Sequence, residues 1–170
     1  MTEAVRYVAF FIFPVGMALA AASDLLTMTI SNRLMLVLGV VFLALAPLVG
    51  MDLHTFAIHL AAAGGVLALA FFCFAMGWIG GGDAKLAAII ALWLGAASSF
   101  DFLLLAAILG GGLTLLILSF RSAVLPAAIV RLPWIQRLHD PRQGVPYGIA
   151  LAAAALAVYP HTLWMTMTAG

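Results

Sequence analysis

Charge is scarce in this sequence. Asp, Glu, Lys and Arg together make up 8% of the 170 residues, whereas a typical soluble domain has about 25%. The mean hydropathy is correspondingly high, at +1.24. This composition excludes an ordinary soluble domain and predicts an integral membrane protein. With a formal net charge of only +1, we expect no nucleic acid among its partners.

Cysteine is almost absent. The one cysteine, Cys73, lies inside an apolar run, which excludes an intramolecular disulfide, a thiolate zinc site and a redox pair. We interpret it as a packing residue. The four histidines are too scattered to form a metal-binding set, so we expect neither a metal nor another cofactor. They are His54, His59, His139 and His161.

Long apolar stretches, in contrast, fill most of the chain. About 20 apolar residues in a helix cross the roughly 30 Å hydrocarbon core of a bilayer. The first stretch has no basic run before it and no clear cleavage site, so we expect a retained helix rather than a signal peptide. The predicted fold is an all-α membrane protein, a single domain over residues 1–170 with six transmembrane helices. The six stretches are about 5–22, 34–50, 56–77, 86–97, 102–120 and 148–164.

The basic residues predict the orientation of these helices. With the N-terminus outside, the outer side holds only Arg6, as the positive-inside rule requires. Both termini are then outside. The fourth stretch is short enough for a re-entrant segment, but the arginine-rich segment 121–142 would then face outward, so six crossings are favoured. This segment can also contact anionic membrane lipid, although topology anchoring is the simpler interpretation. The inner residues are Arg33, Lys85, Arg121, Arg131, Arg137 and Arg142.

The same topology divides the six acidic residues between the inner and outer sides of the membrane. Asp24 lies at the inner end of the first span and Asp83 at the inner start of the fourth, so both share one side and a similar depth. Either residue alone could simply end or cap a helix. Ionisable residues flanked by apolar sequence at membrane depth are, however, candidates for function. The others fall in the outer segments and loops or in a polar inner turn: Glu3, Asp52, Asp101 and Asp140.

Two carboxylates that meet can hydrolyse a peptide bond without a metal or a thiol. They cannot both ionise easily, so one keeps its proton and acts as acid, while the other acts as base toward a water. We therefore predict Asp24 and Asp83 as a catalytic pair. The glycines at 80–82 let the chain turn sharply and let another segment approach closely, and an ordinary connection between helices is the alternative. A phosphate-binding loop is disfavoured, because GGGDAK lacks the GxxxxGK[ST] spacing.

At this point the motifs resemble those of the type IV prepilin peptidases, which are GxGD membrane aspartyl proteases. Residues 80–83, GGGD, match the GxGD signature. Asp24 followed by I-S-N at 30–32 is similar to the D-x5-I-P-N motif of that family, with Ser31 in place of its usual proline. The V-P-Y-G element at 145–148 is similar to the proline-aromatic-glycine element before the last helix of the family.

The resemblance covers about residues 22–151 and implies a function. It implies a multi-pass enzyme of the bacterial inner membrane that removes the leader from prepilins or pseudopilins at the cytoplasmic face, after a glycine. Longer members carry a cytoplasmic insert with paired CxxC elements linked to N-methylation. With one cysteine and a short loop after Asp24, this chain resembles the short peptidase-only form of tight-adherence (Flp-type) pilus systems. We expect no separate soluble or zinc-binding methyltransferase domain; other pilus-assembly proteins are candidate partners.

Further residues are implied to shape the site or bind substrate. Lys85 lies two positions from Asp83, so on a helix it faces another side, and its alternative role is a membrane anchor. Asn32 alternatively marks the start of a helix. The implied set is Gly80, Gly81, Gly82, Asn32, Lys85, Pro146, Tyr147 and Gly148.

Two other functions stay open from the sequence. A GxGD protease related to signal peptide peptidase usually has a tyrosine before the first aspartate and a late proline-alanine-leucine element. Here Ser23 precedes Asp24, and Tyr147 follows Pro146. A non-enzymatic carrier or assembly subunit would use the aspartates to bind ions or to pair. Carriers often have duplicated halves, and no clear repeat is visible in this chain.

Overall fold

The computed structural model describes residues 3–124, 126 and 132–169, and every regular element in these ranges is helical. The predicted all-α class is thereby confirmed. Arg131, one of the predicted inner-side residues, lies outside the described residues. The elements are α1 (Glu3–Thr27), α2 (Asn32–Leu48), α3 (Leu53–Ala75), α4 (Gly81–Ser122), α6 (Pro133–His139), α7 (Tyr147–Val158), the 3-10 helix η1 (Tyr159–His161) and α8 (Leu163–Ala169).

Within the described ranges, three helical segments are long and apolar enough to cross a membrane: Tyr7–Thr27, Leu53–Ala75 and Gly81–Ser122. The helices Asn32–Leu48 and Tyr147–His161 are apolar but shorter. At a rise of 1.5 Å per residue, the 17 residues of α2 span about 26 Å, close to the thickness of a bilayer core. Six crossings and their orientation stay predictions.

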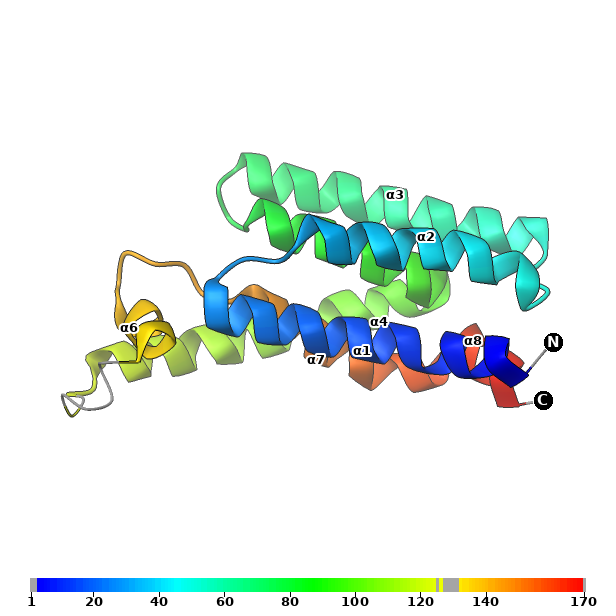
Figure 1. Cartoon of the computed structure of the whole chain (residues 1–170). Coiled ribbons are helices and arrows are strands. Elements are labelled where there is room, and N and C mark those ends of the chain that lie inside the picture. The colour runs from blue at the N-terminus through cyan, green and yellow to red at the C-terminus, as the bar shows by residue number, and fades with distance from the viewer. Residues whose placement is uncertain (1–2, 125, 127–131, 170) are drawn as a thin grey trace.

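Helix α4 reverses direction at Gly95, whose φ of 75° and ψ of 174° are not helical. Figure 1 shows that the two halves of α4 run in opposite directions on either side of this point. Our prediction had the fourth span run to Ala97 and an outer loop hold Asp101 before the next span began at Phe102. That loop is wrong, because one glycine at positive φ makes the reversal and Asp101 lies inside the helix.

The reversal leaves carbonyl groups of α4 without their usual helical partners. His59 from α3 donates from Nδ1 to the carbonyl oxygen of Leu92, at 2.7 Å. Trp164 from α8 donates from Nε1 to the carbonyl oxygen of Trp93, at 2.8 Å. Unpaired carbonyls are costly in apolar surroundings, so these two side chains stabilise the kink that Gly95 permits.

Aromatic rings hold the helices together around this kink. Phe13 of α1 contacts the Tyr159 ring with centroids 4.6 Å apart. Trp93 of α4 contacts Trp164 at 4.8 Å, and Phe42 of α2 meets these two tryptophan rings at 5.7 and 5.6 Å. This cluster fixes α1, α2, α4 and α8 against one another, which also fixes where their ends lie.

The ends that carry the predicted site residues come together. Figure 1 shows the end of α1 and the starts of α2, α4 and α7 at one end of the bundle, with both chain termini at the other. Helix α3 packs along α4, and α7 packs against both α1 and α4. Residues far apart in the sequence therefore meet at the end of the bundle opposite the termini.

Candidate active site

Asp24 lies in the last turn of α1 and is buried, with 5% of its surface exposed. The helix ends just after it, where Met28 adopts a φ of 55°. The Oδ2 atom of Asp24 accepts a hydrogen bond from the backbone N–H of Gly148, at 2.7 Å. The start of α7 thus holds one carboxylate oxygen and leaves acceptor positions on the other.

Asp83 lies in the first turn of α4 and is half-buried. Gly80 is the N-cap residue of this helix, and its backbone makes a hydrogen bond to the Asp83 carboxylate. A bond between the side chain of the third helical residue and the backbone of the N-cap residue is common at helix starts. A carboxylate has about four acceptor positions, so this bond leaves Asp83 able to bind another group.

The two carboxylates face one cavity. It has a volume of about 410 Å³ and is lined by Asp24, by Asp83, by the turn before α4 and by the segment 143–147. The structure therefore brings together the two aspartates that the sequence analysis paired, from helices that lie more than 50 residues apart in the chain. Their catalytic role stays a prediction.

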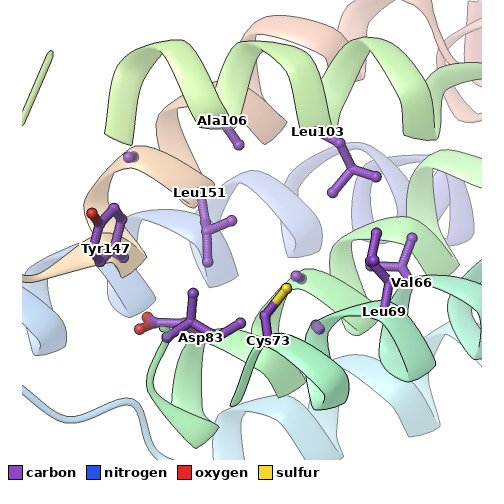
Figure 2. Close-up of a pocket in the computed structure, with 12 residues that line it drawn as sticks. Val66, Leu69, Cys73, Asp83, Leu103, Ala106, Tyr147 and Leu151 are labelled. Atoms are coloured by element: carbon purple, nitrogen blue, oxygen red, sulfur yellow. The ribbon is translucent and has the colours of Figure 1, made fainter. Parts of the chain in front are cut away.

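A second cavity, of about 160 Å³, starts at Asp83 and has almost wholly apolar walls. In Figure 2, Asp83 and Tyr147 lie at one end of it, Cys73 lies near its middle, and Val66 lies toward the other end. Ile79, Asp83 and Tyr147 line both cavities. The carboxylate of Asp83 is therefore located where a cavity with polar walls meets an apolar one.

The glycines before Asp83 act differently from our expectation of a sharp turn. The positive φ of this connection, 75°, belongs to Gly77, while Gly80 is extended and the next two glycines begin α4. A Cβ on Gly80 would lie 3.0 Å from Asp83 Oδ2, and one on Gly81 would lie 3.4 Å from the ring of Phe74. The triplet thus leaves room for the Asp83 carboxylate and the Phe74 ring, and the turn itself is made upstream. Close approach of a substrate to these glycines stays a prediction.

The segment before α7 shapes the same site. Pro146 is buried and is the N-cap residue of α7. The Tyr147 hydroxyl lies 2.9 Å from Thr114 Oγ1, which fixes the ring beside the second half of α4. A Cβ on Gly148 would lie 2.7 Å from Asp24 Oδ2. Only glycine leaves room for the carboxylate at this position.

Ile30, the apolar residue of the I-S-N motif, lies beside two of the predicted site glycines, Gly82 and Gly148. A Cβ on Gly148 would lie 2.8 Å from its Cδ1 atom, and one on Gly82 would lie 3.7 Å from its Cβ atom. This side chain is therefore packed between the starts of α4 and α7. Its position explains why an apolar residue is suited to this place beside the carboxylates.

Arg121 is a second residue whose role the sequence did not reveal. Its Nε donates to the Leu138 carbonyl at 2.8 Å, and its Nη2 donates to the carbonyls of Gln143 and Gly144 at 3.0 and 2.8 Å. It thereby binds the segment that leads to Gly148. Our interpretation of Arg121 as a membrane anchor leaves out these bonds, because their acceptors are backbone groups that follow 17 to 23 residues later.

Asn32 and Lys85 lie outside the lining of the two cavities at the aspartates. Lys85 Nζ donates to Asn32 Oδ1 at 3.1 Å, and both residues line a separate groove. The predicted helix start at Asn32 is confirmed, with Ser31 as N-cap accepting from the Arg33 N–H at 3.2 Å. A role for Asn32 and Lys85 in substrate binding stays a prediction.

No group of three or more His, Cys, Asp or Glu side chains that could hold a metal ion occurs in the part of the chain that the structure describes. The cavity is lined by two carboxylates, Asp24 and Asp83, and the free thiol of Cys73 lies in the apolar cavity. Independence from metals stays a prediction.

Comparison with known proteins adds one finding to this geometry. The model of the type IV leader peptidase family matches residues 11–115. Searches of curated proteins and of solved structures gave no significant match. The matched region includes Asp24 and Asp83 and ends before Gly148. Because the match covers more than half of the 170 residues, this protein belongs to the type IV leader peptidase family, whose members are peptidases.

Proposed function

We propose that this protein is a membrane aspartyl endopeptidase that removes the leader peptide from type IV prepilins or pseudopilins. The observation that carries the proposal is that Asp24 and Asp83, from two different helices, line one cavity. Membership of the leader peptidase family supports the substrate class. The chemistry requires two carboxylates and a water, and no cofactor.

The proposed mechanism uses the pair as one acid and one base. The ionised carboxylate takes a proton from a water whose oxygen attacks the carbonyl carbon of the scissile peptide bond. The protonated carboxyl gives its proton to the carbonyl oxygen, and the tetrahedral intermediate forms. When the C–N bond breaks, the carboxyl that was the base gives its proton to the leaving nitrogen, and the other carboxylate takes back a proton from a hydroxyl of the intermediate, which restores the pair. The bond from the Gly148 N–H holds Asp24 in place throughout.

The two cavities suit a substrate that changes polarity at the cleavage point. The polar end of a leader fits the cavity that holds both aspartates, and apolar side chains next to the cleavage point fit the one that runs from Asp83 past Cys73 toward Val66 (Figure 2). Burial of apolar side chains favours this direction of binding. The scissile bond of such a peptide would then lie beside Asp83.

The proposal includes a location and an organisation. The enzyme has six spans in the bacterial inner membrane, with both termini periplasmic and the aspartates at the cytoplasmic face. Residues 1–170 form one domain, without the zinc-binding methyltransferase part of the longer members. A reporter fused after Arg137 should give a cytoplasmic signal, and a periplasmic signal there would contradict the orientation.

The decisive experiment is cleavage of a candidate prepilin by the purified protein in detergent, with product masses measured. Wild type should cut once, between the leader and the apolar helix, and Asp24→Asn and Asp83→Asn should not cut. Asp140→Asn is the control, because this half-buried carboxylate accepts from the Arg142 N–H at 2.9 Å and does not line the cavity. Cuts inside the apolar segment would instead favour the other class of GxGD protease. A well-folded wild type that cuts no prepilin would favour a carrier or assembly subunit.

A further inference from the structure

A third hollow lies apart from the two cavities at the aspartates. It is a groove of about 470 Å³ between α2 and α3, and the first half of α4 forms its floor. Figure 1 shows these three helices side by side. Its walls are mostly apolar, formed by residues that include Leu36, Val40 and Leu43 of α2, Leu60 and Leu67 of α3, and Ile89 of α4.

One end of this groove is polar and positively charged. Asn32 and Lys85 line it there, both are exposed, and Lys85 Nζ donates to Asn32 Oδ1 at 3.1 Å. An ammonium group has three N–H donors, so this bond to a neutral oxygen leaves two donors and does not neutralise the charge. Helices α2 and α4 both begin at this end, and helix N-termini favour anions.

The length of the groove matches one leaflet of a bilayer. From Asn32 to Leu43, helix α2 rises about 16 Å at 1.5 Å per residue. Half of the roughly 30 Å hydrocarbon core is about 15 Å. A partner helix that crosses the whole membrane would require a surface about twice as long. A polar end followed by one leaflet of apolar wall has the dimensions of a lipid instead.

We propose that this groove binds an anionic phospholipid from the leaflet on the side of the aspartates. The phosphate receives hydrogen bonds from Lys85 and from the amide of Asn32, and an acyl chain lies along the groove toward Leu43. The proposal requires a membrane protein but not peptidase activity. Since Lys85 and Asp83 lie two residues apart on different faces of α4, the lipid and a substrate can be bound at the same time.

Native mass spectrometry of the full-length protein in neutral detergent tests this directly. The probes are phosphatidylglycerol and phosphatidylcholine with identical acyl chains. Wild type should bind phosphatidylglycerol about fivefold more strongly, the equivalent of about 1 kcal/mol for one lysine near an anionic headgroup. Lys85→Gln should remove this preference, and Arg142→Gln, a cation outside the groove lining, should keep it.

Two further variants test the polar end of the groove and its apolar wall separately. Asn32→Asp should lower the preference by placing a carboxylate beside Lys85, without removing the lysine. Leu43→Trp should reduce binding of both lipids by filling the groove, whereas Leu116→Trp, at a position 69% exposed on the second half of α4, should not. Equal binding of the two lipids by wild type, or an unchanged preference in Lys85→Gln, would overturn the proposal. Asp83→Asn should lose cleavage but keep the preference, so the two proposals can fail separately.

Discussion

Two places in this protein put ionisable side chains in apolar surroundings, and they are built in opposite ways. At the kink, buried His59 bonds the Leu92 carbonyl and is not among the residues that line the cavities described above. At the other place, Asp24 and Asp83 each accept one backbone hydrogen bond and still face a cavity.

A buried ionisable residue can therefore be interpreted by what its polar atoms face. Such residues within membrane helices are candidates for function by default, and His59 is the structural exception because its partner is a carbonyl that the kink left free. The aspartates keep acceptor positions that the protein leaves unused. The catalytic role proposed for the aspartates therefore rests on their orientation toward a cavity and not on burial alone.

The largest effect should come from the aspartates. Asp24→Asn and Asp83→Asn should each lower the cleavage rate by on the order of 10⁴-fold, and the double variant should be no worse, because residues that act as one unit fail together. The wild-type rate should follow a bell-shaped pH profile that belongs to the pair. A well-folded single variant that cleaves at nearly the wild-type rate would show that the pair is not catalytic.

A smaller but still large effect should follow from Gly148→Ala. The new Cβ would lie 2.7 Å from Asp24 Oδ2, so the carboxylate must move, and a displacement of about 1 Å can cost about 10²-fold in rate. Single-turnover cleavage measures this loss. The matched control is Gly111→Ala, where a Cβ meets nothing within 4 Å. Equal rates for the two variants would contradict the proposed role of Gly148.

Substitutions at the kink should lower the free energy of unfolding and leave the cleavage rate nearly unchanged. Gly95→Ala forces a side chain into a φ of 75° and puts its Cβ 2.7 Å from His59 Nε2, so we expect a loss of about 1–3 kcal/mol. His59→Ala should lose a similar amount, because the buried Leu92 carbonyl is left unpaired. Thermal unfolding in detergent measures both. The rate per folded molecule should stay within a few-fold of wild type, and a loss like that of Asp83→Asn would make the kink part of the active site.

Some of this site could be predicted from the sequence, for identifiable physical reasons. Hydrophobic stretches predicted the helices, and counting spans between Asp24 and Asp83 placed them on one side, since each crossing switches sides. The position of the reversal could not be predicted in the same way. The break between the stretches 86–97 and 102–120 suggested a loop at Asp101, whereas Gly95 has a conformation that depends on packing against His59. Contacts such as that of Gly148 with Asp24 are long-range, and the family resemblance indicated only that Gly148 helps to shape the site.

Arg121 allows a finer test of how the site is held. It binds the carbonyls of Gln143 and Gly144 with Nη2 and that of Leu138 with Nε, and lysine cannot reproduce this fork of donors. Arg121→Lys should therefore lower kcat by about tenfold through misplacement of the segment before Gly148. Because the arginine does not line the cavity, KM should change less than kcat.

The control for this test is Arg142→Lys, which makes the same arginine-to-lysine substitution in the loop 140–146. Its backbone N–H, and not its side chain, makes the bond to Asp140, so we expect little change in rate. If Arg121→Lys behaved like this control, the three hydrogen bonds would have no part in positioning the site. A rise in KM alone would instead indicate direct contact with the substrate.

The smallest effect should come from chelators and from the loss of the thiol. With two carboxylates as the reacting groups, EDTA should leave the rate unchanged, and a large loss restored by zinc would contradict the mechanism. Cys73→Ala should stay within about fivefold of wild type, the equivalent of about 1 kcal/mol, because the thiol only lines the apolar cavity. A bulky maleimide on Cys73 should nevertheless block cleavage, since it fills the space proposed for the apolar part of the substrate (Figure 2). The same reagent should leave Cys73→Ala active, and full activity of the labelled wild type would place the substrate elsewhere.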